Sequence, residues 1–274
     1  MSQTRFHDVR RFESIDSTNR YLLDEARAGA AEGVVAVADH QTAGRGRLGR
    51  SWEAPAGANL LFSVLLRPTM EPAERHLATT AVALAAIDAI VALAAALDGS
   101  STDAGQRGAA GRIGIKWPND LVGPDGRKLA GILAEADLTS GSAASPAPIV
   151  VGIGVNVNWP AVDEDLPAEL RGTAVSLRQL VGRPVDREAL LSELLAALEP
   201  RVTALSTAQG RARLAEDFRS VCTTVGTRVR VELPDGAFEG TATAVTSEGH
   251  LSVDTGQGIR TVVAGDVIHV RPGS

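Results

Sequence analysis

An alanine-rich apolar stretch from Leu77 to Leu97 restricts the folds open to this 274-residue chain. It is long enough to cross a membrane, but Asp88 stands at its centre, where an acid costs about 2.5 to 3.5 kcal/mol on insertion scales. Alanine is too weakly apolar to offset that cost. The stretch is therefore predicted to be a buried or half-buried helix, with Pro72 as a start signal and Gly99 as a stop signal. We expect no membrane span.

Composition indicates an ordinary globular protein. Apolar residues make up 44% and charged residues 22% of the chain, as in folded domains. The formal net charge of −6 removes the general attraction of a basic domain to nucleic acid, so any basic site must be local. Cys222 is the single cysteine, which excludes an intrachain disulfide, and the polar N-terminus has no apolar signal segment. We expect a cytoplasmic protein.

Apolar patterns predict alternating helices and strands up to about residue 222. Ser17, Thr18 and Asn19 offer N-cap side chains before a short amphipathic helix that ends near Gly29. A Pro-Asp-Gly turn at 124–126 predicts a hairpin. Strands are expected at 34–38, 59–66, 113–116 and 149–157. Helices are expected at about 186–205 and 208–221, and flexible connections at 98–112 and 138–148.

The composition changes near Cys222. Residues 225 to 272 alternate β-prone runs with Pro-Asp-Gly, Ser-Glu-Gly and Gly-Gln-Gly turns. Four or five short strands at that spacing predict a small β-barrel. We therefore expect two domains, at 1–222 and 223–274.

The segment from Gly44 to Arg50 reads GRGRLGR. It fits the G-x-G-x-x-G pattern of dinucleotide-binding folds, but that pattern needs a helix to open at the loop, and here Ser51, Trp52 and a Pro-Ala-Gly turn follow. Binding of NAD is therefore disfavoured. Glycine leaves the backbone pliable, and arginine binds phosphate or carboxylate through paired hydrogen bonds. The segment suits an anion that is enclosed after it enters; a solvated basic loop is the alternative.

A second cationic group surrounds the predicted hairpin. Lys116 ends an apolar strand, where an ammonium needs water or an anion, and Lys128 lies on the returning strand. A structural ion pair between Lys116 and Asp120 is the alternative. With Asn119 as a hydrogen-bonding neighbour, four side chains together indicate a pocket for a phosphoanhydride: Arg45, Arg47, Lys116 and Lys128.

Several other chemistries lack support in the sequence. It contains neither a G-x-x-x-x-G-K-[ST] segment nor a G-x-S-x-G segment, so an ATP site would be of a non-Walker kind and a serine nucleophile is not indicated. Its five histidines do not have metal-ligand spacing. We expect no dedicated metal site.

Five motifs, taken in order, resemble those of the biotin protein ligase family. They are Ser17-Thr18-Asn19, Gln41 to Trp52, Lys116 to Asp120, Lys128 to Leu133, and Gly152 to Asn158. The C-terminal β segment is similar to the SH3-like domain of that family, so the resemblance runs from about residue 12 to the end. It implies an α/β (α+β) fold: a mixed β-sheet catalytic domain flanked by helices, and a small C-terminal SH3-like β-barrel.

The resemblance also implies two half-reactions. Biotin and ATP, which carries Mg²⁺, give biotinyl-5′-AMP and pyrophosphate. A lysine of the biotin carboxyl carrier protein domain of a biotin-dependent carboxylase then takes the biotinyl group. A mixed anhydride is already activated, so such an enzyme chiefly positions it and excludes water. The alternatives are a lipoate-protein ligase, which shares the general fold and adenylate chemistry, and an anion- or RNA-binding module, which net charge and scarce aromatic residues disfavour.

Residue roles follow from the resemblance, motif by motif. Biotin is expected to contact Ser17, Thr18, Asn19, Gln41, Arg45, Gly46, Arg47 and Lys116. The nucleotide is expected to contact Arg45, Arg47, Arg50, Trp52, Asn119, Lys128 and Asn156. Lys116 and Arg47 are the expected catalytic residues, because Lys116 would stabilise charge beside the carboxylate and α-phosphate, and Arg47 belongs to the loop that would close over them.

Two expectations concern the ends of the chain. Some family members carry an N-terminal winged helix, but only about 16 residues precede Ser17, so we expect no specific DNA binding. The C-terminal segment carries no motif for an anion. We therefore expect it to serve transfer to the carrier more than small-molecule binding.

Overall fold

Residues 4–98, 112–137, 147–233, 236–263 and 265–270 are described by the computed structural model. The predicted connections at 98–112 and 138–148 lie almost wholly outside these ranges, as does Gly99. The helices are α1 (Thr18–Arg27), α2 (His76–Asp98), α3 (Leu177–Val181), α4 (Arg187–Ala204) and α5 (Ala208–Val221). Short 3₁₀ turns span Arg47–Gly49, Pro72–Glu74, Asp163–Asp165 and Ala168–Leu170.

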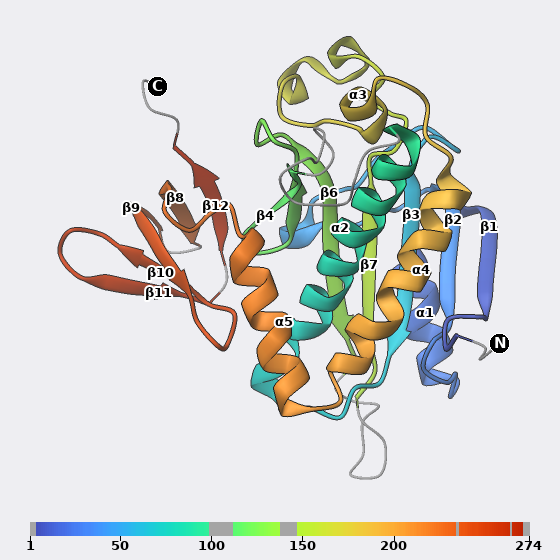
Figure 1. The fold of residues 1–274 in the computed structure, drawn as a ribbon, viewed down its shortest axis with the longest axis horizontal. Helices are drawn as coiled ribbons and strands as arrows, with labels where there is room; N and C mark the ends of the chain where they lie inside the picture. Colours follow the sequence, from blue (N-terminus) through green and yellow to red (C-terminus); the bar gives the residue numbers. More distant parts are fainter. Residues whose placement is uncertain (1–3, 99–111, 138–146, 234–235, 264, 271–274) are drawn as a thin grey trace.

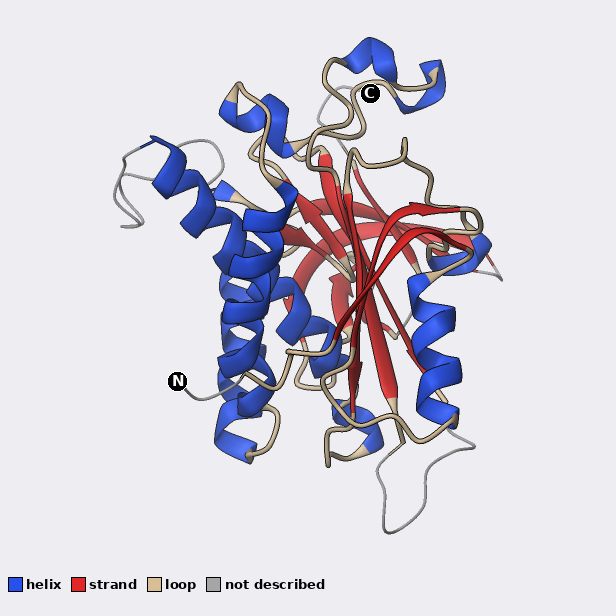
Figure 2. Cartoon of the chain, turned by 90° about the vertical axis from the view of Figure 1, so that its right-hand side faces the viewer, coloured by secondary structure: helices blue, strands red, loops and turns tan. Residues whose placement is uncertain are grey.

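A seven-stranded mixed sheet forms the centre of the larger part. Its strands are β1 (Val9–Ile15), β2 (Val35–Gln41), β3 (Leu60–Leu66), β4 (Gly114–Lys116), β5 (Asp120–Val122), β6 (Lys128–Ala136) and β7 (Ile149–Val155). The spatial order is β1-β2-β3-β7-β6-β5-β4; β1 pairs parallel with β2, and all other neighbours pair antiparallel. On one face α2 lies against the sheet with α4 and α5 beside it, and α1 covers the other face (Figure 1, Figure 2). The predicted mixed sheet flanked by helices is confirmed.

The alanine-rich stretch is the core helix α2. It is long and apolar enough to span a membrane, yet about two thirds of it is buried inside the protein. Ala78, Ala81 and Ala85 are fully buried, and the small side chains let α2 pack closely against both the sheet and α4. Asp88 faces α4, where its carboxylate lies 2.9 Å from the guanidinium of Arg201. The predicted buried helix is confirmed, and its central acid has a cationic partner.

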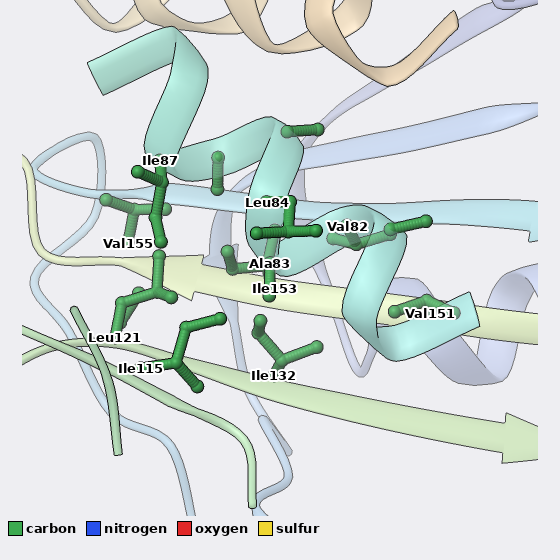
Figure 3. Close-up of a cluster of buried hydrophobic side chains, with 14 of the residues drawn as sticks. Val82, Ala83, Leu84, Ile87, Ile115, Leu121, Ile132, Val151, Ile153 and Val155 are labelled. Atoms are coloured by element: carbon green, nitrogen blue, oxygen red, sulfur yellow. The ribbon is translucent and has the colours of Figure 1, made fainter. Parts of the chain in front are cut away.

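Alternate residues of β7 meet α2. Val151, Ile153 and Val155 point toward the helix and pack against side chains such as Leu84 and Ile87 (Figure 3). Because successive residues of a strand point to opposite faces, the residues between them face away from α2, toward the side on which α1 begins. That second face carries the site described below.

The C-terminal part is an antiparallel sheet beside β4 and α5 (Figure 1). Its strands are β8 (Arg228–Leu233), β9 (Gly236–Val245), β10 (Leu251–Asp254), β11 (Ile259–Val262) and β12 (Asp266–His269), in the order β11-β10-β9-β8-β12. The predicted run of short strands is confirmed. The division expected after residue 222 comes directly after α5 ends at Val221. That the two parts are separate folding units stays a prediction.

Candidate active site

Two glycines of β7 form the floor of a pocket on the face opposite α2. A β-carbon built on Gly152 would lie 2.2 Å from Oδ1 of Asn19, and one built on Gly154 would lie 2.5 Å from Cε2 of Trp52. Real atoms do not approach so closely, so any larger residue would displace these two side chains. The glycines therefore let a polar side chain from α1 and the indole that follows the GRGRLGR loop lie directly against the sheet.

The pocket brings together segments that are far apart in the sequence. Every residue predicted for the site lines it except Asn156. The predicted residues in the lining are Ser17, Thr18, Asn19, Gln41, Arg45, Gly46, Arg47, Arg50, Trp52, Lys116, Asn119 and Lys128. One pocket thus has an uncharged polar end at the start of α1 and a cationic end at β4 and β6.

The polar end is a connected hydrogen-bond network. Ser17 caps α1. Thr18 donates to Oε1 of Gln41 from its backbone N, at 2.8 Å, and its hydroxyl lies 2.7 Å from that of Ser63. Ser63 in turn donates to Oδ1 of Asn19 at 2.7 Å. These buried groups suit a neutral ligand that both donates and accepts hydrogen bonds.

At the cationic end, Lys116 has no carboxylate partner within ion-pair distance among the residues that the structure describes. Asp120 instead pairs with Lys128 at 2.8 Å, so the alternative of a structural pair with Lys116 is not what the structure shows. Burial lowers the pKa of Lys116, and the positive charge of Lys128 adds to this, although Asp120 and Asp266 oppose it. A half-buried ammonium without its own counter-ion favours an anionic ligand.

The two ends of the GRGRLGR loop are joined by backbone hydrogen bonds. Its base is held by hydrogen bonds from Gly46 N to Arg50 O at 2.7 Å and from Trp52 N to Gly44 O at 2.9 Å. At its tip Leu48 has a left-handed backbone (φ 56°) and an exposed side chain. An apolar residue in this conformation at the surface is unusual and marks a locally strained turn.

The loop arginines reach partners around the pocket rim. Arg45 pairs with Glu135 of β6 through two nitrogen–oxygen contacts of 3.0 Å. Arg47 donates to Oδ1 of Asn119 at 3.2 Å, and burial lowers its pKa. The loop therefore contacts β6 and the turn after β4, which are the walls of the cationic end.

The C-terminal sheet reaches the same pocket. Asp266 and Val267 of β12 belong to its lining, and Arg50 of the loop donates to the Asp266 carboxylate. No motif in the sequence indicated this contribution. The expectation that the C-terminal segment serves mainly carrier transfer must therefore be widened to include the small-molecule pocket.

Asn156 is not brought into the lining. Its side chain is buried just past the end of β7, where Nδ2 donates to the carbonyls of Lys128 at 3.3 Å and Val175 at 3.2 Å. Its Oδ1 accepts from Asn59 at 3.3 Å. These contacts hold the backbone of Lys128, so any effect of Asn156 on a ligand passes through that residue.

Among the residues that the sequence did not indicate for the site, Ser63 and Asp266 line the pocket and Glu135 pairs with Arg45 at its rim. Ser63 is the one polar residue in the apolar run of β3, which is the signal that could have found it. Glu135 lies at an alternating position of β6, and Asp266 opens a short strand far along the chain. Neither carries a local pattern that separates it from an ordinary surface acid.

Comparisons with known proteins agree with this geometry. Residues 11–156 match the biotin/lipoate A/B protein ligase family, and residues 224–270 match the biotin protein ligase C-terminal domain. The chain is 39% identical to the biotin–[acetyl-CoA-carboxylase] ligase of Mycobacterium tuberculosis, over 93% of this chain and 86% of that protein. This chain belongs to the biotin protein ligase family.

Other members of the biotin protein ligase family extend the match. The bifunctional ligase/repressor BirA of Bacillus spizizenii is 33% identical, over 92% of this chain and 71% of that protein. The biotin protein ligase of Aquifex aeolicus, solved in complex with biotin and ATP, superposes with a TM-score of 0.74 at 24% identity and covers 97% of this chain and 100% of that one. The match to the Aquifex structure shows that this chain has the fold of a biotin protein ligase.

Proposed function

We propose that this chain joins biotin to ATP in the pocket described above and transfers the biotinyl group to a lysine of a carrier protein. Membership of the biotin protein ligase family supports this activity. The observation that carries it structurally is Lys116, a half-buried ammonium with no carboxylate partner among the described residues, in a pocket that also has an uncharged polar end and the indole of Trp52.

In the first half-reaction, a carboxylate oxygen of biotin attacks the α-phosphorus of MgATP. The bond between the α-phosphorus and the bridging oxygen breaks, and pyrophosphate leaves with the metal. Negative charge gathers on the oxygens of the α-phosphoryl group in the transition state. Lys116 and Arg47, both partly withdrawn from water, would stabilise that charge more strongly than exposed cations could.

In the second half-reaction, the amine of the carrier lysine attacks the acyl carbon of biotinyl-5′-AMP. An amide bond forms, the bond from that carbon to the phosphate oxygen breaks, the nitrogen loses a proton and AMP leaves. The anhydride needs no further activation. The contribution of the chain is to hold it in place and to exclude water, with the GRGRLGR loop as one wall.

Each end of the pocket suits one part of the adenylate. We place the ureido ring of biotin at the network of Thr18, Asn19 and Gln41, where buried donors and acceptors match its N–H and carbonyl groups. We place the nucleotide beside Trp52 and Lys128. The indole N–H of Trp52 is buried and has no acceptor among the described residues, so a ligand atom could accept its hydrogen bond.

We further propose the biotin carboxyl carrier protein domain of a carboxylase as the partner, because the Mycobacterium relative is named for acetyl-CoA carboxylase. A cytoplasmic setting fits the buried free thiol of Cys222. Neither a membrane nor a specific DNA sequence belongs to the proposal. The net charge of −6 argues against DNA, and a sequence-selective gel shift would contradict that part.

The test is carrier labelling with two competing acids. The purified chain, MgATP and an apo carrier domain are incubated with equal amounts of biotin and lipoate, and the carrier mass is measured. We expect a biotinyl adduct on one lysine. Equal or preferential lipoyl labelling would favour a lipoate-protein ligase, and an unmodified carrier would contradict the proposed transfer.

A further inference from the structure

Two successive hydrogen bonds join the C-terminal sheet to Trp117, the residue after Lys116. The backbone N of Trp117 donates to Oγ1 of Thr224 at 2.9 Å. The same oxygen lies 3.0 Å from Nε2 of His269, the last residue of β12. Thr224 is fully buried and His269 half-buried.

The Thr224 hydroxyl can take part in both contacts at once. Its oxygen accepts from the Trp117 N–H, and its proton can be donated to Nε2 of His269 when that nitrogen carries no hydrogen. Burial, and after it the positive charge of Lys116, lower the pKa of His269 to about 4. His269 is therefore neutral near pH 7, and one of its two ring nitrogens is a hydrogen-bond acceptor.

These hydrogen bonds meet the end of β4, whose Ile115 is fully buried, and Nε1 of Trp117 adds a second contact by donating to Gly249 O at 2.9 Å. β4 is three residues long, ends at Lys116 and is one of the two edge strands of the seven-stranded sheet. On one side the backbone of Lys116 lies opposite that of Asp120 in the antiparallel ladder with β5. On the other side the connector between α5 and β8 continues the ladder, because Thr223 N donates to Ile115 O at 2.8 Å. The connector, and the histidine that holds it, thus fix the end of β4.

We propose that Thr224 and His269 are positioning residues that hold the end of β4 so that the ammonium of Lys116 meets the reacting carboxylate and α-phosphate. Neither residue lines the pocket, so neither is expected to touch a substrate. This role rests on the proposed function. Substitutions here should therefore slow the chemical step and leave biotin binding nearly intact.

The first experiment compares substitutions that remove the hydrogen bond with substitutions that keep it. Thr224→Val and His269→Leu remove it; Thr224→Ser and His269→Gln retain a hydroxyl or an acceptor. We expect the first pair to lower kcat for biotin-dependent pyrophosphate release by about tenfold, with KM for biotin changed less than about twofold, and the second pair to stay within about threefold of wild type.

Matched controls separate positioning from general damage. Thr243→Val alters an exposed threonine of β9 and His7→Leu alters an exposed histidine ahead of β1; both should keep the wild-type kcat. Circular dichroism and thermal unfolding establish which variants are folded. Because His269 is only half-buried, its two variants carry the test if Thr224→Val does not fold.

The outcomes are distinct. A folded Thr224→Val or His269→Leu variant with kcat within about twofold of wild type would overturn the proposal. So would a kcat loss shared equally by the variants that keep the hydrogen bond, or a change confined to KM. If the wild-type chain itself released no biotin-dependent pyrophosphate, the proposed function would fail instead, before any variant was compared.

Discussion

Gly154 and Trp52 are packed so closely that a β-carbon on the glycine would lie 2.5 Å from Cε2 of the indole ring. The ring lies against the second face of β7 because the strand offers no side chain there. Nζ of Lys128 lies 5.5 Å from the ring centroid, within the range of a cation–π contact. One backbone position of the central sheet therefore sets the wall of the proposed nucleotide subsite.

Gly154→Ala should displace Trp52 and weaken nucleotide binding. We expect KM for ATP to rise by about tenfold in the pyrophosphate-release assay, because the added methyl group cannot be accommodated without moving the ring. The matched variant is Gly152→Ala, whose methyl group meets Asn19 instead. It should raise KM for biotin more than KM for ATP. The same response to both substitutions would contradict the assignment of the two ends.

His269 should make stability depend on pH in an acidic window. An unfolded histidine titrates near 6.5, whereas burial and Lys116 lower the pKa of His269 to about 4 in the folded chain. Between these values the unfolded state binds more protons, so the free energy of unfolding falls as pH falls from about 6.5 to 4. The loss should be on the order of 2 kcal/mol once solvent screening of the half-buried ring is allowed for. Urea unfolding across this window measures it. His269→Gln should flatten the slope, and an unchanged slope would show that other groups cause it.

Arg47→Gly should let the adenylate escape. The guanidinium bridges the loop to Asn119, and its loss removes a contact that closes the pocket as well as a charge that holds the phosphate. With MgATP, biotin and an unrelated lysine-rich protein, the variant should label that bystander more than wild type does. Arg20→Gly, on the exposed surface of α1, is the control. Labelling no greater than that of wild type, with adenylate formation intact, would exclude a closing role for Arg47.

Asp266→Ala should slow adenylation as well as transfer. Its carboxylate accepts from Arg50 and faces the pocket from β12, so its removal frees one loop arginine and weakens the link between the C-terminal sheet and the loop. We expect a loss of about three- to tenfold in biotin-dependent pyrophosphate release. If activity were lost only in carrier labelling and not in pyrophosphate release, the C-terminal sheet would serve transfer alone.

Continuous apolar runs made much of the fold predictable from the sequence. β7 and α2 were expected because each is apolar over its whole length, and Ser17 was expected to cap α1, as it does. β1 was not expected. It is an edge strand and has no buried residue. Its side chains include Arg10 and Arg11, which pair with Glu25 and Glu188, so apolar alternation is missing.

The site was predictable where a local motif marked it and not where tertiary packing made it. The cationic loop, Lys116 and Lys128 stand out in the sequence because a charge at the end of an apolar strand, or several charges in a glycine-rich loop, indicate an anionic ligand. Asn156 belongs to a motif but is buried under Lys128, which spacing along the chain cannot reveal. Asp266 lines the pocket, and Glu135 pairs with Arg45 at its rim, only because separate strands converge there.

The most direct test of the proposed activity is pyrophosphate release from MgATP by the purified chain, measured with and without biotin and without any carrier. We predict release only when biotin is present, and its loss by at least about a hundredfold in Lys116→Ala. That variant should stay folded, because Lys116 forms no ion pair among the described residues. Arg178→Ala removes an exposed cation of α3 away from the pocket lining and should keep biotin-dependent release. Release that does not depend on biotin, or a folded Lys116→Ala variant within a few-fold of wild type, would contradict the proposed function.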